Sequence, residues 1–170
     1  MNQKRRVSLG SKLTLLIILM AVTLSASGIF MGYQIYSRSM ETHYISLGQR
    51  LLKTAANYID ADKLDAYLRT GEEDRNYHDT LELLRTFRKN NGVMYLYVIK
   101  PVEEGTYFIF DSEEGEGRYA LGGFSGWHDA FQSAIADFLD GNTVDPRISN
   151  GEYGWLLSVA EPLHGSDGMV

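Results

Sequence analysis

The 170-residue sequence contains no cysteine, only three prolines and, within its first 36 residues, no aspartate or glutamate. Without cysteine the chain can form no disulfide, no thiolate zinc site and no cysteine nucleophile. No proline precedes Pro101, so no proline breaks a helix in the N-terminal half. The acidic residues lie later and give a net charge of −6, which argues against a nucleic-acid partner.

A long run without charge follows the basic N-terminus. Residues 13–33 are 21 consecutive uncharged residues. As a helix they would span about 30 Å, the thickness of the hydrocarbon core of a bilayer. The basic residues before the run favour the cytoplasmic side of the membrane: Lys4, Arg5, Arg6 and Lys12. We therefore predict a cytoplasmic segment 1–12, a single transmembrane helix 13–36 in the lipid bilayer and an extracytoplasmic part 37–170.

A cleaved signal peptide is the alternative interpretation of the same run. Ala26-Ser27-Gly28 provides small residues at the spacing that signal peptidases cleave. The apolar run, however, continues past that site through Ile29, Phe30 and Met31, and it is longer than the apolar region of an ordinary signal peptide. The pattern favours an uncleaved anchor.

The outer part alternates between helical and strand-like patterns. Residues 37–60 carry apolar side chains at three- and four-residue steps and predict a stalk helix that continues from the membrane. Two further helices, two β-hairpins and a helix between the hairpins follow, which together predict an α+β domain with helices on one face of an antiparallel sheet. The predicted segments are helices 60–71, 77–91 and 127–139, strands 93–100 and 106–112, a loop at 113–126, and strands 147–149 and 153–161 around Asn150-Gly151.

An ordered set of short pieces in this layout resembles a known family. The pieces are Tyr58-Ile59-Asp60, the run from Gly92 to Val98, the run from Tyr107 to Asp111, Ile148 to Asn150, Tyr153 to Ser158, Glu161-Pro162-Leu163 and Asp167-Gly168. In this order they resemble the extracytoplasmic Cache domains of bacterial receptors, which have a PAS-like fold. The resemblance covers residues 37–170.

The resemblance implies a role in signal transduction. Single Cache domains recognise small molecules outside the bacterial cell membrane, work as homodimers and signal through membrane helices to a cytoplasmic output. It also implies a last, central strand after Asp167-Gly168, then a second membrane helix and an output module. The sequence ends at Val170, so we expect a receptor truncated before that strand.

The resemblance places a ligand between the sheet and the segment 113–145. Small-molecule sites are commonly lined by aromatic side chains together with a few polar groups. Asp111 would suit an amine, and Arg118 or Arg147 a carboxylate, which leaves the class of ligand open. Taken alone, each aromatic residue is more often part of an ordinary core than of a binding site. The candidate ligand-binding residues are Tyr95, Tyr97, Tyr107, Asp111, Arg118, Trp127, Phe131, Arg147, Tyr153 and Trp155.

Motifs for catalysis, metals or cofactors are missing from the sequence. It has no Gly-x-Ser-x-Gly elbow, no phosphate loop and no dinucleotide fingerprint. Its four histidines lie far apart, and the acidic stretch after Asp111 does not match an EF-hand, so we expect no metal, no cofactor and no enzyme. Two alternatives stay open. One is a ligand-free scaffold, in which Tyr95, Trp127, Phe131 and Trp155 fill the pocket themselves. The other is an anchored surface enzyme that uses Asp111 or His128.

Overall fold

The computed structural model describes residues 8–151 and 154–166. The chain divides into two compact units, Met1–Tyr44 and Ile45–Val170. The first is the N-terminal part of helix α1 (Leu9–Ala56), which continues without a break into the second. The predicted anchor and stalk are therefore one helix, and it ends at Ala56 rather than at residue 60. Tyr58 N and Ile59 N donate to Ala55 O and Ala56 O, which tightens the last turn and closes the helix.

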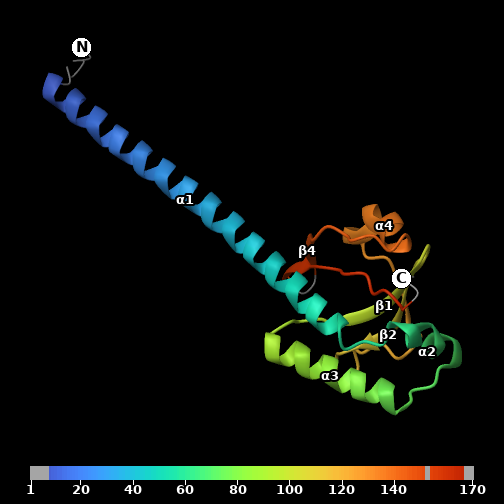
Figure 1. Ribbon diagram of the computed structural model, residues 1–170. Helices are drawn as coiled ribbons and strands as arrows, with labels where there is room; N and C mark the ends of the chain where they lie inside the picture. The colour runs from blue at the N-terminus through green and yellow to red at the C-terminus, as the bar shows by residue number, and fades with distance from the viewer. Residues whose placement is uncertain (1–7, 152–153, 167–170) are drawn as a thin grey trace. The chain divides into compact units, whose positions relative to one another are not determined.

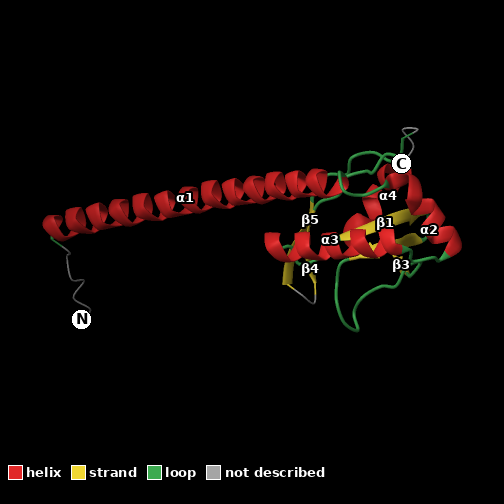
Figure 2. Cartoon of the chain, turned by 60° about the horizontal axis from the view of Figure 1, so that its bottom comes forward, coloured by secondary structure: helices red, strands yellow, loops and turns green. Residues whose placement is uncertain are grey.

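The second unit is an α+β domain, as the sequence predicts (Figure 1). After α1 come η1 (Ala61–Lys63), α2 (Leu64–Thr70) and α3 (Arg75–Asn91), then strands β1 (Tyr97–Val102), β2 (Gly105–Asp111) and β3 (Phe124–Gly126). The chain continues with η2 (Asp129–Ala134), α4 (Ile135–Leu139), β4 (Arg147–Gly151) and β5 (Gly154–Ser158). Figure 2 shows that the strands are short and that long loops join several elements.

Local chemistry explains where α3 begins and ends. The Asp74 carboxylate accepts a 2.7 Å hydrogen bond from Tyr77 N, which caps the first turn. This backbone bond holds the pKa of Asp74 below its usual range, against the smaller opposing effect of desolvation. At the other end Gly92 adopts a left-handed conformation with φ 63°, which glycine tolerates without strain, and the helix stops there.

The described strands form two separate antiparallel sheets rather than one. The first has the order β1-β2-β3, and the second is the β4-β5 hairpin. Strand β1 runs to Val102, beyond the predicted stop at Pro101, because an edge strand tolerates a proline. The predicted helix 127–139 is instead a 3-10 helix followed by the short α4, since His128 Nδ1 accepts from Ala130 N and begins η2 there.

The core lies between α3 and the first sheet, with the end of α1 and α2 beside it. On α3, Tyr77, Leu81 and Leu84 recur at four- and three-residue steps and are buried. The remaining buried members of this cluster are Ala55, Tyr67, Leu96, Val98, Ile109 and Phe110. Helix α4 lies on the side of the strands away from α3 (Figure 1).

A β-bulge decides which side chains of β2 enter this core. Val98 pairs with Phe110 and Ile99 pairs with Phe108, so Ile109 has no partner across the ladder. Ile109 and Phe110 are consequently both buried in the core. The phenol of Tyr77 donates a 2.9 Å hydrogen bond to Ile109 O at the bulge and so holds α3 against the strand.

Candidate functional site

A row of touching aromatic rings lies along β1, β2 and the loop that follows. Tyr95 stacks on Tyr97 at 5.9 Å, Tyr97 meets Phe108 edge-on at 5.1 Å, and Phe108 stacks on Tyr119 at 4.0 Å between ring centroids. Phe108 and Tyr119 are not among the predicted site residues. Regular alternation along β2 would put Phe108 on the opposite face from Asp111, and only the bulge changes this. No signal in the sequence announces that bulge.

Tyr107 is separate from this row. It pairs with Lys100 across the ladder, is partly exposed, and its ring contacts Phe124 at 5.2 Å. Regular alternation along β2 would put Tyr107, Ile109 and Asp111 on one face of the strand. The bulge prevents this, because Tyr107 pairs with Lys100 and Asp111 with Tyr97, and Lys100 and Tyr97 point to opposite faces of β1.

Burial and nearby carboxylates keep the phenol of Tyr97 uncharged. Burial raises the pKa of Tyr97 far above its usual range, and the nearby carboxylates of Glu113 and Asp111 raise it further. Burial also raises the pKa of Glu113, Asp111 adds to this effect, and Arg88 opposes it. The phenol of Tyr97 therefore remains a neutral hydroxyl group throughout the physiological pH range.

Asp111 is buried and braces the loop after β2. One carboxylate oxygen accepts from Glu113 N and the other accepts from Tyr119 N, each at 2.8 Å. Ser112 N donates to Leu96 O at 3.2 Å and extends the pairing of β1 with β2. Both oxygens of Asp111 thus hold backbone amides of this chain, an arrangement that positions Tyr119 on Phe108.

Replacing Asp111 by alanine is expected to lower the free energy of unfolding by about 1.5–3 kcal/mol, the usual contribution of a hydrogen bond to a charged group. The variant Asp111→Asn keeps one acceptor and should lose less. Urea unfolding of the full chain in detergent micelles measures both. An alanine variant that unfolds like the unmodified chain but loses ligand binding would instead show that Asp111 serves a ligand.

The two candidate arginines have different surroundings. Arg118 lies close enough to Tyr77 to oppose the rise in the pKa of that phenol, which burial causes and Glu73 reinforces. The Nε atoms of Arg118 and Arg147 are buried and have no hydrogen-bond partner within the described part of the chain. Arg118 therefore belongs to the α3 side of the domain, and Arg147 begins β4.

A second aromatic group sits at the turn between β1 and β2. The indole of Trp127 donates to Val102 O at 3.0 Å and to Glu103 O at 3.2 Å. Its ring lies 5.1 Å from Phe138, and Phe131 lies 5.7 Å from Phe138. Trp127 thus connects α4 to this turn, and Phe138 contacts both of the other rings.

The remaining two candidates lie on the second hairpin. Trp155 is 75% exposed and shares the outer face of the hairpin with Ile148, because Asn150 pairs with Trp155 and Ile148 with Leu157. Tyr153 lies outside the described residues. The predicted residues therefore include two separate aromatic groups and one outward-facing tryptophan.

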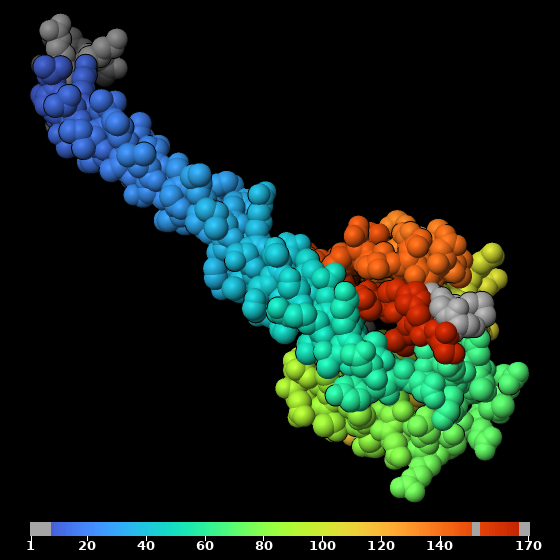
Figure 3. Space-filling model, viewed as in Figure 1, coloured from blue at the N-terminus to red at the C-terminus, as the bar shows by residue number. Residues whose placement is uncertain are grey.

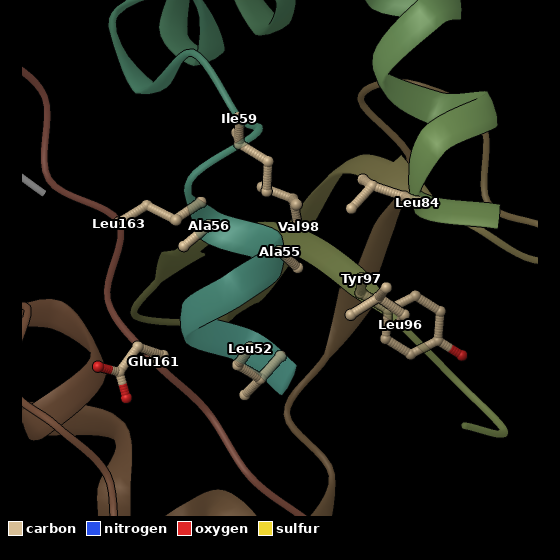
Figure 4. Close-up of a pocket in the computed structure, with 10 residues that line it drawn as sticks. All are labelled: Leu52, Ala55, Ala56, Ile59, Leu84, Leu96, Tyr97, Val98, Glu161 and Leu163. Carbon is tan, nitrogen blue, oxygen red and sulfur yellow. The ribbon is translucent and has the colours of Figure 1, made fainter. Parts of the chain in front are cut away.

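A pocket lies elsewhere in the same unit, between the end of α1, β1 and the segment 161–163 (Figure 4). The cavity has a volume of about 40 Å³, enough for two or three waters or one small apolar group. Tyr97 is the one predicted site residue in its lining. The lining residues are Leu52, Ala55, Ala56, Ile59, Leu84, Leu96, Tyr97, Val98, Glu161 and Leu163.

Helical spacing of Leu52, Ala55 and Ile59 is the signal that could have located one wall of this pocket. The opposite wall comes from residues far along the chain and has no local signature. Within residues 8–151 and 154–166, no group of three or more histidine, aspartate or glutamate side chains is placed to hold a metal ion. No family model, no curated protein and no solved structure matches this chain.

Proposed function

We propose that this chain is a membrane-anchored sensor for signal transduction across a bacterial cell membrane. Residues 37–170 would be an extracytoplasmic, PAS-like domain of the single Cache type, with the N-terminus in the cytoplasm. The observation that carries the proposal is that α1 has a long apolar stretch and also contributes to the core of the domain. Within the described part of the chain, α1 is the one helix long and apolar enough to cross a membrane, and its last residues belong to the core of the α+β unit.

The exposure of α1 changes along its length. The apolar side chains of the run 13–33 are exposed, whereas Ala55 is 2% exposed and Leu52 is half-buried. Exposed apolar surface of that extent suits lipid rather than water. A continuous helix that serves as both anchor and core element transmits a change in packing along its axis, which is the supporting argument for a signalling role.

The small-molecule site of this proposal is the aromatic row of Tyr95 and Tyr97 with the loop braced by Asp111. A ligand acts only through a difference in affinity between two states of the domain. The proposal includes a homodimer. Among the apolar side chains that recur along residues 37–60, Tyr44 and Tyr58 are exposed, whereas Ala55 packs inside its own domain. Pairing would therefore use the outward part of α1.

A ligand-free scaffold or dimerisation domain is the second candidate. Its supporting observation is that the predicted pocket residues Tyr95, Trp127 and Phe131 contact other rings. The pocket beside α1 is also too small for most metabolites.

A thermal-shift screen on the full chain in detergent micelles distinguishes the small-molecule sensor from the ligand-free scaffold. Organic acids, amino acids, amines and nucleobases would be tested at increasing concentration. For a sensor we expect one class to raise the melting temperature, and a ligand at a hundred times its Kd adds about 2.7 kcal/mol of stability. A variant Tyr97→Ala should abolish that rise, whereas Trp155→Ala should leave it. A folded chain that ignores every class supports the scaffold.

A further inference from the structure

The segment after β5, residues 159–166, contacts the end of α1 and η1 at several points. A Cβ built on Gly48 would lie only 2.8 Å from Val159 Cγ2. Lys53 Nζ lies 3.6 Å from Glu161 Oε1. Leu163 points toward Ala56 across the pocket (Figure 4). At the end of the segment Ser166 N donates a 2.7 Å hydrogen bond to the Asp62 carboxylate. We call residues 159–166 the clasp.

The clasp follows α1 in register. Positions 159, 161 and 163 of the clasp lie next to positions 48, 53 and 56 of the helix, in that order. Eight helical residues rise about 12 Å, and four extended residues span about 13 Å, so the two lengths match. The clasp therefore lies along the helix and fixes both its rotation and its axial position. In Figure 3 the red atoms of the clasp lie beside the green-cyan end of α1, with a hollow between them.

Gly48 makes this close approach possible. Any larger side chain at position 48 would push against Val159, because a Cβ there already overlaps the valine methyl group. Inside a helix, glycine by itself is only a weak point. Its contact with Val159 gives this glycine a specific role in the packing of the domain.

The contacts of the clasp are few enough to open. Residues 159–165 belong to no helix or strand, so no ladder of backbone hydrogen bonds holds them. The Lys53 side chain is 67% exposed, and an ion pair at such a site contributes about 0–1 kcal/mol. Among the described residues, a few side chains and one backbone hydrogen bond hold this segment, so it opens at lower cost than a core strand.

We propose that residues 159–166 form a releasable clasp that sets the register of α1, and that displacement of the clasp frees the helix to turn. The pocket lies between α1, β1 and the clasp, and Glu161 and Leu163 of the clasp form part of its lining. The signalling use of this release rests on the proposed function. The clasp itself does not, because its contacts lie within one chain without ligand.

Disulfide trapping tests the register directly, since the chain has no cysteine of its own. The built Cβ of Gly48 lies 3.8 Å from the Cβ of Val159, the mean separation in disulfides. The full-length double variant Gly48→Cys/Val159→Cys, in membranes, should oxidise within the chain. The matched control is Gln49→Cys/Val159→Cys, which turns the partner about 100° around the helix. We expect the first pair to oxidise at least about tenfold faster.

Equal rates for the two pairs would overturn the fixed register, and no bond between positions 48 and 159 would overturn the clasp. Adding Lys53→Glu to the first pair should slow oxidation, and adding Glu161→Lys as well should restore it. An unchanged rate with Lys53→Glu would show that the ion pair is not part of the clasp. Because this assay uses no ligand, its result is independent of whether the thermal-shift screen finds one.

Discussion

Replacing Leu84 by alanine is expected to lower the free energy of unfolding by about 2–5 kcal/mol. This is the usual range when a buried leucine is truncated and leaves a cavity. Leu84 is 0% exposed and packs in the core shared by α3 and the first sheet. It also lines the pocket beside α1, so the truncation enlarges a space that is already open. Since small domains are stable by only about 5–15 kcal/mol, such a loss is a large share of the total.

Leu139→Ala is the matched control for this substitution. Leu139 ends α4 and is 42% exposed, and truncating it should change stability by no more than about 0.5 kcal/mol. Urea unfolding of the full chain in detergent, followed by near-ultraviolet circular dichroism, compares the two leucine variants. Equal destabilisation by both would mean that the core does not lie where α3 meets β1 and β2.

The sequence pattern was sufficient for elements whose signals are local. The spacing of Tyr77, Leu81 and Leu84 predicted α3 and its buried face, and Gly92 predicted its end. The strand-like patterns of residues 93–100 and 106–112 predicted the hairpin that β1 and β2 form, although β1 covers Tyr97–Val102. In each case the signal and the structure that it predicts lie within a few residues of each other, so local propensity and periodicity are enough.

Features that depend on distant contacts were not predictable. The bulge at Ile109 is stabilised by Tyr77, which lies 32 residues away, and it decides which side chains of β2 are buried. The approach of Val159 to Gly48 joins residues more than a hundred positions apart. The candidate site was therefore predicted only in part: its residue types were named, but which of them touch depends on the bulge and on α4.

Two aspartates in the middle of the apolar run, Leu19→Asp with Val22→Asp, are expected to prevent membrane integration. Each costs about 2.5–3.5 kcal/mol at the centre of a membrane helix, so the pair removes about 5–7 kcal/mol. The apolar side chains of α1 around Leu19 are exposed, and within the described residues nothing of the protein covers them. The variant should move from the alkali-resistant membrane pellet to the soluble or aggregated fraction.

The control pair, Ser39→Asp with Thr42→Asp, adds the same charge to the same helix beyond residue 36 and should leave the chain in the membrane. The intact mass of the membrane-bound chain distinguishes the anchor from a cleaved signal peptide. An anchor retains residues 1–26, whereas cleavage near Ala26-Ser27-Gly28 removes them. A soluble chain that begins near Gly28 would contradict the anchor and would also remove the route by which α1 is proposed to carry a signal inward. If the full-length chain stays in the membrane and the run 13–33 is its anchor, then the helix that the clasp contacts is the same helix that enters the bilayer.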